Sequence, residues 1–153
     1  MRVTLDTNVL VSAFISKRGH SADILDLIAT FDEIVLVLSN NILEEFKDVL
    51  SRKEVAARFD YTRTDIAKFE ASIRDVAEII AVRSSLKVVR EDPDDDVVVN
   101  TAIDGRADYI VSGDRHLREL KRFQRVGIVS PRAFMTILTK RFGDLILSGD
   151  ELV

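Results

Sequence analysis

Aspartates stand where apolar, strand-like runs of this sequence give way to helical patterns. Asp6 follows the first run, the cluster Asp92–Asp96 precedes a helical pattern, and Asp114 follows a later run. Each could simply cap a helix, because aspartate accepts hydrogen bonds at helix starts and favours the positive end of the helix dipole. In a parallel sheet, however, the strands end along one edge, so the carboxylates must converge there. Either the pKa of one acid then rises strongly, or a divalent cation lies between them.

The composition limits which metal such a site could hold. The chain of 153 residues contains no cysteine and two histidines, His20 and His116. This excludes thiolate sites and argues against a His-rich zinc site. The remaining oxygen ligands favour magnesium or manganese. The net charge of −4 argues against nucleic-acid binding over the whole surface, but it leaves room for a local basic patch.

Helical geometry distinguishes two neighbouring glutamates. A helix is predicted after Ser39 or Asn40, with an apolar face made of Ile42, Leu43, Phe46, Val49 and Leu50. At about 100° per residue, Glu45 lies roughly 100° from the centre of that face, at its border. Glu44 lies roughly 160° away and is predicted to face solvent. Glu45 can therefore point into a cleft, although acids at such borders are also common without any function.

The same geometry separates the clustered aspartates. The next helix carries an apolar stripe made of Val98, Val99, Ala102 and Ile103. Asp95 projects along the centre of this stripe, whereas Asp94 and Asp96 lie roughly 90–110° to either side. We therefore expect Asp95 at the edge of the sheet and Asp94 or Asp96 in the role of a helix cap.

A basic run follows Asp114 directly. It covers residues 115–125 and contains four candidate nucleic-acid-binding residues, Arg115, Arg118, Lys121 and Arg122. The run is either a solvated helix face or a track for phosphates beside the acids. Lys17, Arg18 and His20, in the polar loop after the first helix, could lengthen that track. No aromatic platform of the kind that stacks single-stranded bases is visible.

The elements that must position these residues alternate between strands and helices. Strands are expected at residues 2–5, 34–38, 86–89, 109–112 and 127–129. Helices are expected to begin near Asp6, Ser21, Ser39 or Asn40, Thr64 or Asp65, Asp95 and Pro131. The helix from Thr64 or Asp65 is expected to run through Ile80, residues 115–125 are a helix or loop, and residues 143–153 receive no assignment. This order predicts an α/β protein of one domain over residues 1–153: a three-layer α/β/α fold with a central, mostly parallel sheet of four or five strands.

Targeting signals give little information. The sequence opens on a strand and shows no basic segment followed by an apolar core, so no signal peptide is visible. No apolar run approaches the roughly 18 residues that span a bilayer. We therefore expect a cytoplasmic protein without a membrane partner.

Four short motifs occur in an order that resembles the PIN-domain family. They are Leu5-Asp6-Thr7-Asn8-Val9-Leu10, Ile42-Leu43-Glu44-Glu45-Phe46, Asp92-Pro93-Asp94-Asp95-Asp96 and Val111-Ser112-Gly113-Asp114. The resemblance extends from Val3 to about Phe134. The branch that looks most similar is the toxin component of toxin–antitoxin systems, related to the VapC ribonucleases. Each motif alone is weak, but four in this order form a fairly specific pattern.

The resemblance implies a role for each matching residue. The family's catalytic and metal-binding acids correspond to Asp6, Glu45, Asp95 and Asp114, and the supporting residues correspond to Thr7, Asn8 and Ser112. His116 stands where some members have a further acid. The implied activity is that of an endoribonuclease that uses one or two Mg²⁺ or Mn²⁺ ions to hydrolyse RNA phosphodiester bonds. The implied partners are the RNA substrate, a cognate antitoxin and a second copy of the chain in a homodimer.

Two other functions remain open at this point. A haloacid-dehalogenase-like phosphatase also begins with a strand and an aspartate, but it needs a second aspartate two residues later, where this chain has Asn8. A non-catalytic PIN-fold protein that acts through protein contacts would be marked by the loss of an acid, and all four acids are present.

Overall fold

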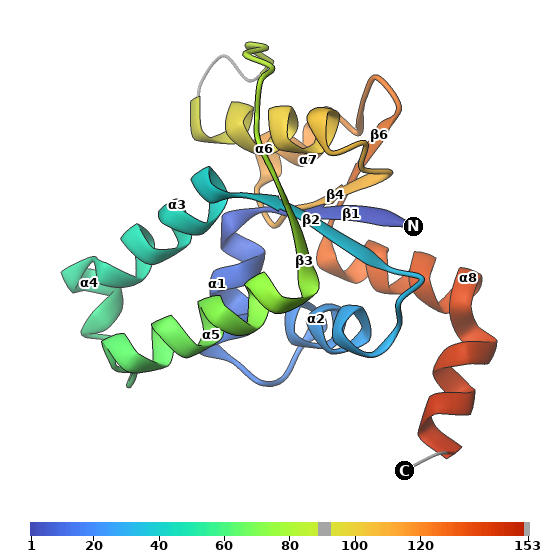
Figure 1. Ribbon diagram of the computed structural model, residues 1–153, viewed down its shortest axis with the longest axis horizontal. Helices are drawn as coiled ribbons and strands as arrows, with labels where there is room; N and C mark the ends of the chain where they lie inside the picture. The colour runs from blue at the N-terminus through green and yellow to red at the C-terminus, as the bar shows by residue number, and fades with distance from the viewer. Residues whose placement is uncertain (89–92, 152–153) are drawn as a thin grey trace.

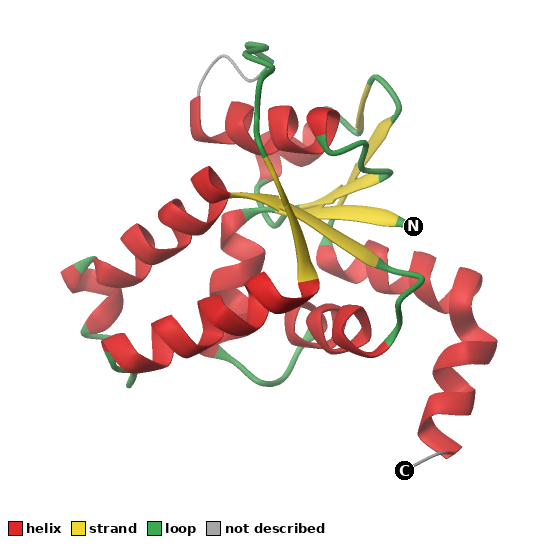
Figure 2. Cartoon of the chain, in the orientation of Figure 1, coloured by secondary structure: helices red, strands yellow, loops and turns green. Residues whose placement is uncertain are grey.

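A twisted, mostly parallel sheet runs through the molecule (Figure 2). The computed structural model describes residues 1–88 and 93–151. Within these residues the sheet has six strands in the order β3-β2-β1-β4-β6-β5. Their bounds are β1 Arg2–Leu5, β2 Val35–Ser39, β3 Ala77–Ile80, β4 Tyr109–Val111, β5 Arg122–Phe123 and β6 Val126–Val129. All neighbouring strands are parallel except β5 and β6. The predicted fold class is confirmed, but the expected number of four or five strands is wrong.

Helices cover both faces of this sheet and form the outer layers (Figure 1). Helix α6 (Pro93–Asp104) lies on one face, and α1 (Thr7–Ile15), α2 (His20–Thr30) and α8 (Pro131–Glu151) lie on the other. Helix α3 (Asn40–Ser51) packs beside α1 and leads through α4 (Lys53–Ala56) to α5 (Arg63–Val76). The short helix α7 (Arg115–Glu119) follows β4. No helix in the described part of the chain is long and apolar enough to cross a membrane.

Burial on both faces of the sheet explains the many apolar residues of the central strands. Val3, Leu5, Leu36 and Leu38 are completely buried, because β1 and β2 are covered by helices on both faces. Leu5 of β1 pairs with Val111 of β4, so these two strands end at the same level. The residues that follow them are therefore neighbours at one edge of the sheet.

One predicted helix is too long, because its last turn is a strand. Helix α5 begins with a capping box between Thr62 and Asp65 rather than at Thr64 or Asp65, and it ends at Val76. The next four residues form β3, which pairs in parallel with β2 from Leu36↔Ala77 to Ser39↔Ile80. The apolar residues of this segment fit a helix and a strand equally well. The open edge of β2 decides between them, since it supplies backbone hydrogen bonds.

The strand predicted at residues 86–89 is absent from the described residues. The segment of residues 81–88 instead runs along α6, where side chains satisfy its backbone groups. Three polar side chains at intervals of four residues on α6 bind it: Asp96 accepts from Val88 N, Asn100 bonds both backbone groups of Leu86, and Asp104 accepts from Arg83 N and Ser84 N. These side-chain hydrogen bonds replace the backbone hydrogen bonds that a neighbouring strand would provide. Val89 lies outside the described residues.

Three further element boundaries differ from the prediction. Helix α2 begins at His20 after Gly19, whose φ of 108° suits glycine, so Ser21 lies in the first turn and is not the cap. The basic run forms α7 and then the short β5–β6 hairpin, which turns at Gln124 with φ 53°. Helix α8 continues through most of the unassigned end of the chain, with a non-helical backbone at Phe142.

Candidate active site

A cavity of about 220 Å³ opens where the parallel strands end. It is lined by Asp6, Thr7, Asn8, Val11, Glu45, Val49, Asp95 and Asp114. The structure therefore brings the four predicted acids together. One acid follows each of the strands β1 to β4: Asp6 comes directly after β1, Asp114 lies three residues after the end of β4, and Glu45 and Asp95 stand on α3 and α6. Val11 and Val49 are the two apolar residues of the lining. The sequence did not point to either, because apolar residues on a helix are normally part of the core.

Asp6 is both a helix cap and a cavity acid. Its Oδ1 accepts from Thr7 N at 2.7 Å and caps α1, and its backbone N–H donates to Val111 O at 2.9 Å. Its Oδ2 accepts from Ser112 Oγ at 2.6 Å and from Asn8 Nδ2 at 3.3 Å. Asp6 is 5 % exposed and is fixed by three hydrogen bonds to its carboxylate and one from its backbone N–H, with partners on α1 and at the end of β4. Capping a helix and lining the cavity are therefore compatible roles for Asp6.

The paired glutamates of α3 face in different directions. Glu45 is half-buried and lines the cavity, whereas Glu44 is exposed, as the helical geometry predicts. The hydroxyl of Thr7 donates to Glu45 Oε2 at 3.0 Å. Thr7, in the first turn of α1, therefore orients two acids: its backbone N–H holds Asp6, and its hydroxyl holds Glu45.

Neighbouring aspartates on α6 also separate. Asp95 is 5 % exposed and lines the cavity. Asp96 is half-buried, and its Oδ1 accepts from Val88 N at 2.8 Å. Asp96 is therefore a ligand of the 81–88 segment and does not line the cavity. The side chain of Asp94 lies outside the described residues.

Ser112 links Asp6 and Asp114 through hydrogen bonds. Its hydroxyl is fully buried, donates to Asp6 and accepts from Asp114 N at 2.9 Å. Asp114 is half-buried, and its Oδ1 caps α7 by accepting from His116 N and Leu117 N. Asn8 Oδ1 accepts from Gly113 N at 3.1 Å, which ties the loop after β4 to α1. The three predicted supporting residues thus form a hydrogen-bonded frame around the acids.

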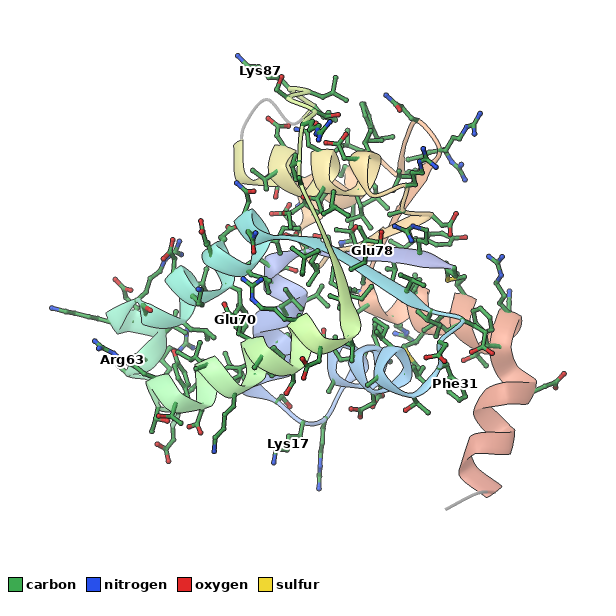
Figure 3. All side chains as sticks on the ribbon, in the orientation of Figure 1. Lys17, Phe31, Arg63, Glu70, Glu78 and Lys87 are labelled. Atoms are coloured by element: carbon green, nitrogen blue, oxygen red, sulfur yellow. The ribbon has the colours of Figure 1, made fainter. Side chains whose placement is uncertain are left out.

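None of the predicted basic residues lines the acid cavity. Lys17 and Arg18 are exposed in the loop after α1, and Lys17 points away from the body of the molecule (Figure 3). The other four, Arg115, Arg118, Lys121 and Arg122, are exposed on α7 and around β5. Arg115 pairs with Glu119 at 3.0 Å. These residues form a charged surface next to Asp114 in sequence, and their contribution to binding stays a prediction.

The donor set fits a hard divalent cation. Four carboxylates line one cavity, and oxygen is the ligand that magnesium and manganese prefer. In the described part of the chain, however, no three acidic or histidine side chains already stand close enough to form a metal cluster. The acids therefore surround a cavity rather than a preformed cage. Asp6, Glu45, Asp95 and Asp114 are the residues that would hold the ion.

Comparisons with known proteins agree with this fold. The family model of the PIN domain matches residues 2–116. An uncharacterised protein of Methanocaldococcus jannaschii, MJ1680, is 36% identical over 124 residues, which cover 79% of this chain and 76% of that protein. Among solved structures, the crystal structure of VapBC2 from Rickettsia felis bound to a DNA fragment from their promoter matches with a TM-score of 0.57. It covers 84% of this chain and 97% of that chain at 19% identity, so it shows similarity of fold.

The fold, the order of the motifs and the family match lead to one assignment. The match spans well over half of the 153 residues and includes all four cavity acids. The relative from M. jannaschii is similar over most of the same length. This chain therefore belongs to the PIN-domain family.

Proposed function

We propose that the protein is an endoribonuclease that depends on Mg²⁺ or Mn²⁺ and acts as the toxin of a toxin–antitoxin pair. The observation that supports catalysis is the gathering of Asp6, Glu45, Asp95 and Asp114 around one cavity in a chain of this family. The similarity in fold to VapBC2 supports the pairing with an antitoxin. A homodimer and a cytoplasmic location belong to the same proposal.

The protein's own part in the reaction is to hold the acids in place. A bound divalent cation supplies Lewis-acid stabilisation of the phosphate and activation of water. Ser112 and Asn8 fix Asp6, and Thr7 fixes Glu45, so these carboxylates need little rearrangement when the charge on the phosphate develops. Val11 and Val49 add apolar side chains to the lining of the cavity.

The test is cleavage of RNA by purified protein. Labelled RNA and DNA of the same sequence are incubated with Mg²⁺, with Mn²⁺ and with a chelator. We expect the RNA to be cut only with metal, and we expect Asp6→Asn to reduce the rate at least a hundredfold, or about 2.7 kcal/mol of barrier. A preparation that binds metal but cleaves neither single-stranded nor structured RNA would favour the non-catalytic alternative.

The toxin role has a separate readout. Induced expression of the parent chain is expected to stop growth, whereas expression of Asp6→Asn is not. Co-expression of the protein from a neighbouring small reading frame should restore growth. Growth arrest of equal strength in both strains would show that toxicity does not come from the acid cavity.

A further inference from the structure

A larger cavity lies at the opposite end of the sheet from the acid cavity. Its volume is about 480 Å³. It opens where the parallel strands β4 and β6 begin, whereas the acid cavity opens where such strands end. Its lining comes from the end of α6 and the β5–β6 hairpin, which lie side by side in Figure 1, and includes Ala102, Arg106, Asp108, Gln124, Arg125 and Val126. We call it the distal cavity.

Two side chains of the distal cavity stand where the backbone favours glycine. Arg106 follows α6 with φ 55° in a Schellman motif, in which Ala107 N donates to Ala102 O at 2.8 Å and Arg106 N donates to Ile103 O at 3.1 Å. Gln124 has φ 53° at the first position of the two-residue turn between β5 and β6. Glycine adopts both conformations without strain, so these long polar side chains are present against a local preference. Residues held in this way are common where a protein binds a ligand.

The lining combines an apolar floor with a rim of hydrogen-bond donors. Ala102 and Val126 are almost fully buried, whereas Arg106, Gln124 and Arg125 are exposed. Neither guanidinium forms an ion pair with any residue that the structure describes. Arginine planes stack on the bases of single-stranded RNA, and their forked donors bind pairs of acceptors on base edges. The distal cavity therefore suits a nucleobase better than a bare phosphate.

Guanine is the base whose edges match these groups. It presents two neighbouring acceptors, O6 and N7, which one arginine can bind together, and an amino donor at N2. Asp108 supplies the acceptor for such a donor, and its Oδ2 is held in place by Arg2 N at 2.8 Å. The same carboxylate would repel an acidic peptide, so the charges favour a base over a partner of that kind.

The basic run of residues 115–125 connects the two cavities. It begins directly after Asp114 of the acid cavity and ends at Arg125 of the distal cavity. Because β5 pairs antiparallel with β6, the run returns from the end of β4 to the level where β6 begins. Asp108 and Asp114 are six positions apart, which corresponds to about 20 Å at most along β4. A stacked strand with about 3.4 Å between phosphates covers that distance in roughly six nucleotides.

We propose that the distal cavity binds one guanosine of the RNA strand whose scissile phosphate lies at the acid cavity. This inference rests on the proposed nuclease function and names a specificity site for its substrate. Arg106 and Arg125 bind the base, and the basic run holds the phosphates between the two cavities. The guanosine lies roughly six nucleotides from the bond that is cut.

The test measures binding of RNA in the presence of a chelator, so it does not depend on cleavage. The probes are a strand of twelve uridines, the same strand with one central guanosine, and free guanosine 5′-monophosphate. We expect the central guanosine to raise the affinity about tenfold and to shift the amide NMR signals of Arg106, Ala107, Gln124 and Arg125. The free nucleotide should shift the same signals but bind about tenfold more weakly than the guanosine strand, because it does not reach the basic run.

The backbone around the distal cavity offers variants that keep the fold. Arg106→Gly removes a guanidinium where φ suits glycine, so the melting temperature should not fall while the gain from guanosine is lost. Arg125→Ala should reduce the same gain. Lys121→Gly is the matched control, since Lys121 has φ 59° and belongs to the basic run but does not line the distal cavity. It should leave the gain from guanosine intact, even where it weakens binding of both strands equally.

The outcomes separate this proposal from the nuclease proposal. Equal affinity for the two strands, or amide shifts confined to other residues, overturns the distal site even if RNA is cleaved. Free nucleotide that binds as tightly as the guanosine strand also overturns it, because the cavity would then be a site for a mononucleotide. A gain that Arg106→Gly removes and Lys121→Gly keeps supports the distal site even if no metal restores cleavage. Where cleavage occurs, cuts placed without regard to the guanosine overturn the proposal.

Discussion

Asp95 and Asp96 are adjacent, and the structure predicts opposite effects when each is changed. Asp95→Asn keeps the shape of a side chain that lines the acid cavity but removes one negative charge from it. We expect magnesium-dependent cleavage to fall at least a hundredfold, or about 2.7 kcal/mol of barrier. The metal-free protein should become more stable, because repulsion from Asp6, Glu45 and Asp114 is relieved.

Asp96 should affect stability instead. Asp96→Ala removes the carboxylate that accepts from Val88 N at 2.8 Å. Hydrogen bonds to charged groups contribute about 1.5–3 kcal/mol, and the lower end applies to a half-buried group. We expect a loss of about 1.5 kcal/mol in the free energy of unfolding, which corresponds to a fall of roughly 3–6 °C in melting temperature. Asp96→Asn retains an acceptor oxygen and should lose less.

The assay pairs single-turnover cleavage of a labelled RNA with thermal unfolding of the same preparations. Asp96→Asn should keep its rate within about tenfold of the parent, because the side chain does not line the cavity. Glu45→Gln and Glu44→Gln form the equivalent pair on α3, where only Glu45 reaches the cavity. Equal losses of activity within either pair, or a larger loss at Asp96 than at Asp95, would refute the assignment of helical faces. Full activity in both Asp95→Asn and Glu45→Gln would refute the nuclease proposal.

Three further predictions concern the metal, the basic run and acid pH. Millimolar Mg²⁺ or Mn²⁺ should raise the melting temperature of chelator-treated protein, since binding to the folded state alone stabilises it; an unchanged melt argues against the site. Neutralising Arg115, Arg118, Lys121 and Arg122 together should flatten the salt dependence of RNA binding with little change in stability, and an unaltered slope would make the run a solvated surface. The hydroxyl and amide of Ser84, with the amide of Arg83, hold the pKa of the Asp104 carboxyl below its ordinary value of 3.8. Because folding depresses this pKa, the ionised Asp104 carboxylate stabilises the folded protein above pH 3.8, and this stabilisation is lost as the pH falls through the folded pKa. The NMR amide signals of Arg83 and Ser84 should therefore titrate in that pH range, and Asp104→Asn should abolish the titration.

The local signals of the sequence were sufficient to predict most of the site. Asp6 and Asp114 stand at strand ends, and helical periodicity is enough to face Glu45 and Asp95 inward. These features depend on residues that are close in the sequence, so they can be predicted from the sequence alone. The choice of Glu45 over Glu44 needed only the apolar stripe of α3.

The errors arose where distant contacts decide the structure. Ile79 and Ile80 continue the helical pattern of α5, yet the free edge of β2 makes them a strand. Leu86 and Val88 have the pattern of a strand, yet their backbone N–H groups donate to the side chains of Asn100 and Asp96. The start of α2 could not be predicted either, because Ser21 fits the pattern of a helix cap and only the conformation of Gly19 shows that the helix begins earlier.

The two edges of the sheet restrict how another protein chain can bind. One edge is β3, a strand of four residues that carries Glu78, and the other is β5, a strand of two residues that carries Arg122. Short edges with charged side chains resist the addition of a further strand, and the same features oppose edge-to-edge aggregation. A partner that binds by extending the sheet is therefore disfavoured. An antitoxin would have to lie across the helices, where side chains rather than backbone hydrogen bonds determine which partner is accepted.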